Sequence, residues 1–194
     1  MKPKLRFKEF TDDWEEKKLG EIADVIMGQS PNSDSYNENY EGLPLIQGNA
    51  DIKNGKTIRR IFTTCPTKVC DKNTLIMTVR APVGELGVSS DKVCIGREVC
   101  AIISPLQKYI YHYLKAKEEK WTMYSQGSTF EAVNSKDIKE FKIQFPSLPE
   151  QEKIANFLSL LDQRIEKEKE KLRLLKEEKK GKILNMLLIK FGEN

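Results

Sequence analysis

The most regular pattern of hydrophobic and polar positions in this chain covers residues 147–180, and it predicts one long helix. No glycine or proline follows Pro149 within this stretch. Ser147 and Glu150 have the spacing of a capping box, in which each side chain bonds the other's backbone N–H. Apolar residues spaced alternately by four and three form a coiled-coil seam that one glutamate interrupts. The seam positions are Ile154, Leu158, Leu161, Ile165, Glu168, Leu172 and Leu175.

This long helix is expected to need a partner. About 30 residues at ~1.5 Å each make a rod of roughly 45 Å. A helix that exposes a narrow apolar seam is unstable alone, because tertiary packing supplies most of the stability of a protein helix. The sequence contains no second helical pattern of this length, so the seam is predicted to pack against a helix of another molecule.

Upstream of the helix, the pattern changes to short apolar runs separated by turn residues, which predicts strands. The runs lie at 45–46, 58–62, 75–79, 86–88 and 93–103. Asn54-Gly55 is a typical hairpin turn. Residues 28–43 are dense in Gly, Ser and Asn, so they predict a long irregular loop, a kind of segment that is usually functional or mobile.

Two further segments complete the predicted fold. Residues 106–124 have a helical period, and residues 141–145 alternate as a strand that leads into the long helix. Together the patterns predict an α+β fold. A mixed, strand-rich globular domain is expected at 1–146, followed by one long C-terminal helix at 147–190. The sequence has no internal repeat with a period of about 20–50 residues.

Composition and charge add little to this picture. The net charge is +4, with 39% hydrophobic and 32% charged residues, as in a soluble protein that carries a long solvated helix. No apolar run approaches the ~18 residues of a membrane span, and the N-terminus lacks the apolar core of a signal peptide. A cytoplasmic location away from membranes is therefore expected. Nine Lys or Arg and five Asp or Glu lie between residues 51 and 98, an excess that suggests an anionic partner.

The motifs of several catalytic classes are absent from the sequence. It has no phosphate-binding G-x-x-x-x-G-K-[ST] loop, no dinucleotide-binding glycine pattern, and no Asn/Asp-Pro-Pro-aromatic motif of adenine methyltransferases. His112, the only histidine, is predicted to lie on a helix face without a nucleophile motif around it. The four cysteines lack C-x-x-C spacing, which favours reduced thiols over a zinc site. The chain is therefore predicted to bind a partner without catalysing a reaction, and to hold no metal.

Three stretches together resemble the specificity subunit of type I restriction–modification systems. The first, GQSPNSDSYNENYEGLPLIQGNADIKNG, is similar to the start of a target recognition domain of that family. The second, LIMTVRAPVGELGVSSDKVCIGREVCAI, resembles its strand-rich centre. The third and most specific is QGSTFEAVNSKDIKEFKIQFPSLPEQEKIANFLSLLDQRI, with a G-S-T-F loop, a strand, P-x-L-P-E-Q and the start of the coil. The resemblance covers roughly residues 14–186.

The resemblance implies a non-catalytic subunit within a larger DNA-modifying complex. Full-length members have two target recognition domains, each followed by a conserved helix, and the two helices pack antiparallel. Each domain reads one half of a bipartite sequence in double-stranded DNA, and the coil sets the gap between the halves. The coil also helps to dock two methyltransferase subunits, which bind S-adenosylmethionine and catalyse methylation, and a translocating nuclease subunit joins for restriction. No cofactor is expected on this chain itself.

The sequence departs from the family pattern in three respects. It has one recognition domain and one helix where the family has two. Glu98 follows Arg97 where a glycine is common, and the chain ends in KILNMLLIKFGEN instead of a Leu-rich segment. One domain with one helix predicts an antiparallel homodimer through the seam, with Glu168 near a lysine of the opposite helix. Two such domains would read an interrupted palindrome whose halves lie somewhat more than one DNA turn of ~34 Å apart.

The candidate DNA contacts divide into two roles. Arg and Lys bind guanine edges or phosphates, whereas Gln and Asn bind adenine edges. Loops on a rigid scaffold are where recognition residues are usually found. The candidates for base reading are Gln29, Ser30, Arg59, Arg60, Ser128 and Thr129, and those for phosphate or positioning contacts are Lys53, Lys56, Arg80 and Arg97.

Other interpretations of the sequence stay open. The chain could pair with a different recognition module, or it could be a truncated product of a longer specificity subunit. A coiled-coil adaptor without a DNA role explains the long helix, but it leaves the R-A-P-V-G and Q-G-S-T-F loops without a purpose.

Overall fold

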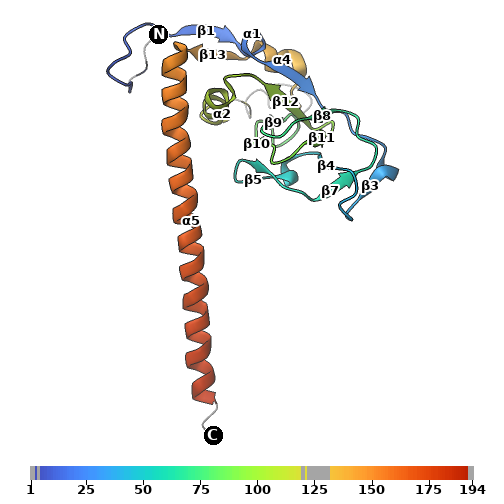
Figure 1. The fold of residues 1–194 in the computed structure, drawn as a ribbon, viewed down its shortest axis with the longest axis vertical. Coiled ribbons are helices and arrows are strands. Elements are labelled where there is room, and N and C mark those ends of the chain that lie inside the picture. Colours follow the sequence, from blue (N-terminus) through green and yellow to red (C-terminus); the bar gives the residue numbers. More distant parts are fainter. Residues whose placement is uncertain (1–2, 4, 119–120, 122–131, 192–194) are drawn as a thin grey trace. The chain divides into compact units, whose positions relative to one another are not determined.

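The computed structural model describes residue 3, residues 5–118, Trp121 and residues 132–191 of the 194-residue chain. The chain divides into two compact units, Met1–Glu152 and Lys153–Asn194. The first unit contains a six-stranded, a five-stranded and a two-stranded sheet with short helices, and the second consists of the long helix α5 beyond its first turn (Figure 1). This arrangement of elements confirms the predicted α+β class.

The largest sheet is mixed, and its central strands are buried on both faces. Its order is β2-β12-β9-β10-β6-β5, and every pair is antiparallel except β10 with β6. The strands are β2 (Asp24–Met27), β12 (Val99–Ile103), β9 (Leu75–Thr78), β10 (Leu86–Val88), β6 (Lys56–Thr57) and β5 (Ile52–Lys53). Burial on both faces explains why β9 and β12 appear in the sequence as continuous apolar runs.

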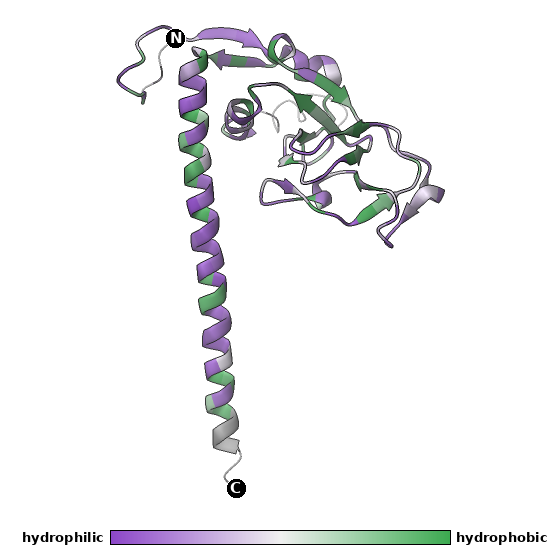
Figure 2. Cartoon of the chain, viewed as in Figure 1, coloured by the Kyte–Doolittle hydropathy of each residue, from purple (hydrophilic) through white to green (hydrophobic). Residues whose placement is uncertain are grey.

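The five-stranded sheet shares its core with the six-stranded one. Its order is β3-β7-β4-β11-β8, with β11 and β4 parallel and the other pairs antiparallel. The strands are β3 (Tyr36–Asn37), β7 (Ile61–Thr63), β4 (Leu43–Ile46), β11 (Val93–Ile95) and β8 (Val69–Cys70). Hydrophobic residues concentrate on several strands of this unit (Figure 2). Side chains from both sheets form one buried cluster of Ile46, Cys70, Ile76, Val93, Ile95, Val99 and Ala101.

The apolar run at 93–103 forms two strands that belong to different sheets. β11 ends at Ile95 in the five-stranded sheet, and β12 begins at Val99 in the six-stranded sheet. Gly96 lies at this change of sheet, where its N–H donates to Ile46 O at 2.8 Å and its carbonyl accepts from Val99 N at 3.2 Å. The pattern did not predict the division, because both strands are buried and the run stays apolar on either side of the break.

Short helices and turns connect these strands. They are α1 (Leu19–Ile22), α2 (Gln107–Lys115), α4 (Ser135–Glu140) and the 3-10 turns η1 (Ser33–Ser35) and η2 (Asn49–Asp51). Asn134 caps α4 by accepting the N–H groups of Lys136 and Asp137, while the Asp137 carboxylate accepts the N–H of Asn134. α2 covers the first half of the helix predicted at 106–124, and part of the remainder lies outside the described residues.

The two ends of the first unit are tied together by a strand pair and by an ion pair. β1 (Glu15–Lys18) pairs antiparallel with β13 (Lys142–Phe145), and α5 (Leu148–Phe191) begins directly afterwards. Glu150, in the first turn of α5, is fully buried and accepts two bonds of 2.7 Å from the Arg6 guanidinium and one of 3.2 Å from Trp14 Nε1. Both carboxylate oxygens therefore bind the N-terminal segment, whereas the sequence spacing predicted a capping box with Ser147.

In the second unit, α5 is a charged helix whose side chains pair along its own axis. The helix has 44 residues, which corresponds to about 66 Å. Arg173 bonds both Glu170 and Glu177, and Lys169 bonds Glu166. Figure 2 shows α5 as largely hydrophilic, with separate hydrophobic patches along its length. Within the described ranges, no helix is both long enough and apolar enough to cross a membrane.

Replacing Glu150 by Ala is expected to lower the Tm by roughly 5–10 °C, because it leaves a guanidinium and an indole N–H without their acceptor in a largely buried setting. The Arg6 side chain is only 12% exposed, and that of Glu150 is 1% exposed. Glu166→Ala is the matched control, since its ion pair with Lys169 is exposed and should contribute almost nothing. Thermal unfolding followed by circular dichroism measures both. Equal Tm values for the two variants would contradict a structural role for the buried pair.

Candidate nucleic-acid interface

Three polar loops meet where β2, β4, β9 and β11 all end, and we call them the loop cluster: residues 28–30, 47–48 and 96–98. Gly28 N–H donates to Val99 O at 3.0 Å, and Gln29 N–H donates to Ile95 O at 2.9 Å. Ser30 Oγ accepts the N–H of Arg97 at 3.1 Å. Backbone bonds therefore hold the first and third loops side by side.

Glycine permits this close approach of the backbones. A Cβ added to Gly28 would lie 2.1 Å from the carbonyl oxygen of Gly96, a distance at which the backbone would have to move. A Cβ added to Gly96 would lie 3.3 Å from the Cα of Gln47, so the middle loop lies against the third. The polar residues that follow these glycines are thus presented together.

Asp51 connects Arg60 to the loop cluster. Its Oδ2 accepts the N–H groups of Gln47 at 2.8 Å and Gly48 at 3.3 Å, and its Oδ1 accepts Arg60 Nη1 at 3.2 Å. The Asp51 side chain is buried, whereas that of Arg60 is about half-exposed at 49%. The aspartate therefore fixes the middle loop and places one edge of a guanidinium beside it, with the rest of the guanidinium exposed.

Arg80 adjoins the third loop through the main chain. Val79 N–H donates to Glu98 O at 2.8 Å, which extends the pairing of β9 with β12 by one residue. Arg80 follows directly and is exposed. The structure therefore brings together five of the predicted contact residues: Gln29, Ser30, Arg60, Arg80 and Arg97.

The loop cluster also contains two polar residues that were not among the predicted contacts, Gln47 and Glu98. Each lies immediately beside a glycine or an arginine of the cluster, in Gln47-Gly48 and Arg97-Glu98. A polar residue next to a glycine at the end of an apolar strand was the available signal for Gln47. Glu98 was noted in the sequence only as a departure from the family pattern.

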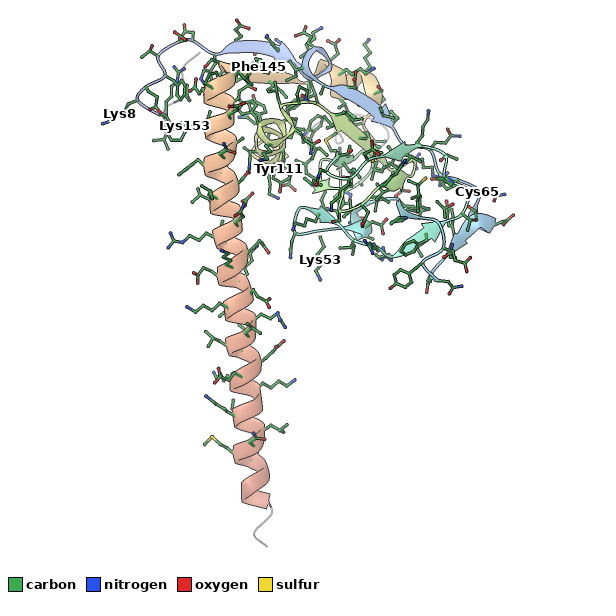
Figure 3. All side chains as sticks on the ribbon, viewed as in Figure 1. Lys8, Lys53, Cys65, Tyr111, Phe145 and Lys153 are labelled. Carbon is green, nitrogen blue, oxygen red and sulfur yellow. The ribbon has the colours of Figure 1, made fainter. Side chains whose placement is uncertain are left out.

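Lys53, Lys56 and Arg59 form a second group, outside the loop cluster. The predicted Asn54-Gly55 hairpin is confirmed, with positive φ angles of 52° and 71° at the two turn residues and Lys53 paired with Lys56. Both lysines are exposed, and the Lys53 side chain extends away from the ribbon (Figure 3). Phosphate contacts by these two lysines stay a prediction, which their exposure permits because a lysine ammonium acts as a point charge.

Arg59 lies in a bidentate ion pair with Asp91. Its Nε donates to Oδ2 at 2.8 Å and its Nη2 donates to Oδ1 at 2.5 Å. The shared hydrogen bonds raise the pKa of Arg59 and lower the pKa of Asp91. The Arg59 side chain is still 55% exposed, so the guanidinium edge that carries Nη1 faces away from the aspartate. Base reading by Arg59 stays a prediction, as do the roles of the other candidates.

Ser128 and Thr129 lie outside the described residues. In the part of the chain that is described, no group of His, Cys, Asp and Glu could hold a metal ion. Cys70, Cys94 and Cys100 are buried free thiols, and burial raises the pKa of Cys70 to about 11 and that of Cys100 to about 12. These two thiols are therefore protonated at neutral pH, which makes them poor nucleophiles and poor metal ligands.

The predicted seam lies along α5 and is substantially exposed. Leu161, Ile165, Leu172 and Leu175 are 41–53% exposed, and Ile154 and Leu158 are partly exposed. Glu168 is also exposed. Ile183 and Met186 follow Leu172 and Leu175 by eleven residues, or about three helical turns. The apolar face therefore resumes beyond the lysines that interrupt the heptad pattern.

Comparison with known proteins places these features in one family. Residues 11–177 match the model of the type I restriction modification DNA specificity domain. A Methanocaldococcus jannaschii protein described as the MjaX type I restriction enzyme specificity subunit is 39% identical over 187 residues, with 93% of this chain and 44% of that protein covered. The MjaIX specificity subunit of the same organism is 28% identical over 182 residues, with 84% and 41% covered.

Solved structures give the same result. A chain from a study of complex assembly and conformational transition of the type I R-M system superposes with a TM-score of 0.73 at 34% identity, over 81% of this chain and 40% of that one. The HsdS subunit from Thermoanaerobacter tengcongensis superposes with a TM-score of 0.68 at 32% identity, over 81% and 39%. The chain thus spans about two fifths of the length of the relatives it matches.

Replacing Gly28 by Ala is expected to lower the free energy of unfolding by about 1–3 kcal/mol, because the new methyl group meets a backbone carbonyl that cannot move alone. Gly48→Ala is the matched control in the same cluster. The nearest atom to its added Cβ is at the far end of the Glu98 side chain, at 3.0 Å, and this side chain can rotate away. Urea unfolding measures both variants. Equal midpoints would show that the approach of Gly28 to Gly96 is not a constraint.

Proposed function

The chain belongs to the type I restriction–modification DNA specificity family, and on this premise we propose that it recognises a specific sequence in double-stranded DNA for a methyltransferase complex. The observation that carries the proposal is the loop cluster. It brings amide, hydroxyl and guanidinium groups together at the common end of four strands. Such groups read base edges and bind phosphates, and loops on a rigid scaffold commonly present them.

The basic residues around the cluster suit a division of roles. Arg60 is held by a buried aspartate at one edge and exposed elsewhere, a geometry that favours a directed contact with a base edge. Gln29 and Ser30 offer neutral hydrogen-bonding groups in the loop cluster itself. Arg80 and Arg97 are exposed, as are the lysines of the β5–β6 hairpin, and their charges suit the DNA backbone.

Pairing of two copies through α5 completes the proposed recognition unit. An exposed apolar face on a long charged helix is unstable in water and favours a partner with the same face. Antiparallel pairing about a two-fold axis lets each face cover the other, and it allows Glu168 to approach a lysine of the opposite helix. The two loop clusters would then read the halves of an interrupted palindrome, with the helices as spacer.

In the proposed function, the chain itself catalyses no reaction. Methyltransferase subunits would dock on the paired helices and supply both S-adenosylmethionine and the methyl-transfer chemistry. A nuclease and translocase subunit would join the same assembly for restriction. A second arrangement is also supported, because the relatives are more than twice as long as the matched region. In that arrangement the chain pairs with a different recognition module.

Methylation mapping in cells that express this chain with its cognate methyltransferase subunits tests the proposal directly. We expect every modified site to share one interrupted motif, and a palindromic motif if the chain pairs with itself. An asymmetric interrupted motif would favour pairing with a different module. Cells that carry the methyltransferase subunits without the chain are the control. Identical methylation in the presence and absence of the chain would contradict a role in sequence recognition.

Substituting both Leu161 and Leu172 by Lys is expected to convert the homodimer to monomer at micromolar concentration, because two charges would enter each half of the apolar seam. Leu160→Lys is the control. Leu160 is more exposed, at 64%, but it lies about 100° around the helix from Leu161. Light scattering and sedimentation measure the mass. A monomeric wild-type chain, alone and with methyltransferase subunits, would contradict self-pairing.

A further inference from the structure

Glu98 places a carboxylate among the cations and amides of the loop cluster. We infer that it is a specificity-determining residue, which accepts a hydrogen bond from the exocyclic amino group of cytosine or adenine. The inference rests on the proposed function, since it requires the loop cluster to face DNA bases. It goes further by assigning a base class to one residue.

The position of Glu98 is set by its main chain and by a glycine. Its carbonyl accepts the N–H of Val79 at 2.8 Å, one residue before the pairing of β12 with β9 begins. Its Oε2 lies over the middle loop, where a Cβ added to Gly48 would be only 3.0 Å away. The half-buried Glu98 side chain therefore lies over Gly48, which has no side chain to displace it.

 In contrast to Glu98, two other acidic residues of this unit are already bonded to arginines. Asp51 is bonded to Arg60 and to two backbone N–H groups, and Asp91 is bonded to Arg59. Among the residues that the structure describes, none forms a hydrogen bond or ion pair with the Glu98 carboxylate. Its oxygens are therefore available to a ligand, although arginines lie on the same surface.

The chemistry of DNA limits what such a carboxylate can contact. An ionised carboxylate only accepts hydrogen bonds. Phosphates and deoxyribose rings within a duplex offer no donor, so the DNA backbone can only repel Glu98. The exposed donors of a base pair are cytosine N4 and adenine N6 in the major groove, and guanine N2 in the minor groove. Arginine and lysine could equally serve the backbone, but an acceptor-only side chain must read a base or oppose binding.

The major-groove donors suit this site best. The loop cluster combines Glu98 with Gln29, Gln47 and Arg97, and Arg60 and Arg80 adjoin it. These are side-chain types that read the donor and acceptor pattern of the major groove. Burial of the carboxylate against a base without an amino group would leave it unpaired, which is unfavourable. Glu98 therefore favours cytosine or adenine at one position and disfavours guanine and thymine, whose major-groove edges carry no amino group.

The test compares the whole chain, assembled with its methyltransferase subunits, with Glu98→Ala and Glu98→Gln variants. Each assembly selects from a pool of randomised duplexes, which are sequenced before and after binding. For Glu98→Ala we expect the same motif with one position per half-site relaxed, discrimination there reduced about tenfold, and binding to other duplexes unchanged or stronger. Glu98→Gln should prefer adenine at that position, because an amide both donates to N7 and accepts from N6.

Two further variants separate this role from a structural one. Gly48→Ala keeps the charge but pushes the carboxylate aside, so it should relax the same position as Glu98→Ala. Asp24→Asn removes an exposed carboxylate at the opposite end of β2 and should leave the motif unchanged. If both Glu98 variants select the wild-type motif unaltered, the inference about Glu98 is overturned and the proposed function stands. Failure of the wild-type assembly to select any motif would overturn the proposed function and the inference with it.

Discussion

The close approach of the Gly28 and Gly96 backbones is the constraint on which the loop cluster depends. Gly28 directly follows β2 of the six-stranded sheet, and Gly96 lies where the chain leaves the five-stranded sheet for the six-stranded one. Their contact therefore joins the two sheets above the core that they share. Gln29 and Ser30 follow Gly28 directly, and Arg97 and Glu98 follow Gly96. The contact between the two glycines therefore also determines which of these side chains lie together.

Local patterns predicted the local structure well. The Asn54-Gly55 hairpin, the central strands and the long helix all follow from turn chemistry and periodicity, which depend on near neighbours. The contacts that organise the site link residues far apart in sequence, as in the ion pair between Arg6 and Glu150. A sequence pattern shows that Glu150 can cap a helix, but it carries no information about a partner 144 positions away. The division at Gly96 was missed for another reason, because the strands on both sides of it are buried and the run stays apolar on either side.

Ion pairs within the long helix compensate several of its charged side chains. Arg173, Lys169 and Lys182 are bonded to glutamates of the same helix, so their charges are already compensated along its surface. Such exposed pairs contribute little to stability, but they keep the helix hydrated on its polar side. The apolar residues have no equivalent arrangement within the helix. The seam residues are therefore exposed apolar side chains on an otherwise charged helix, as the proposed pairing requires.

The pairing of β1 with β13 gives the recognition domain the character of a cassette. The chain enters and leaves the domain on adjacent strands, and every loop of the cluster lies between them. A genetic exchange that replaced the intervening segment by another of the same fold would keep the entry and exit points in register. New recognition loops would then be joined to an unchanged helix. Under the proposed function, such an exchange would change the DNA sequence that is read and would leave the long helix as it was.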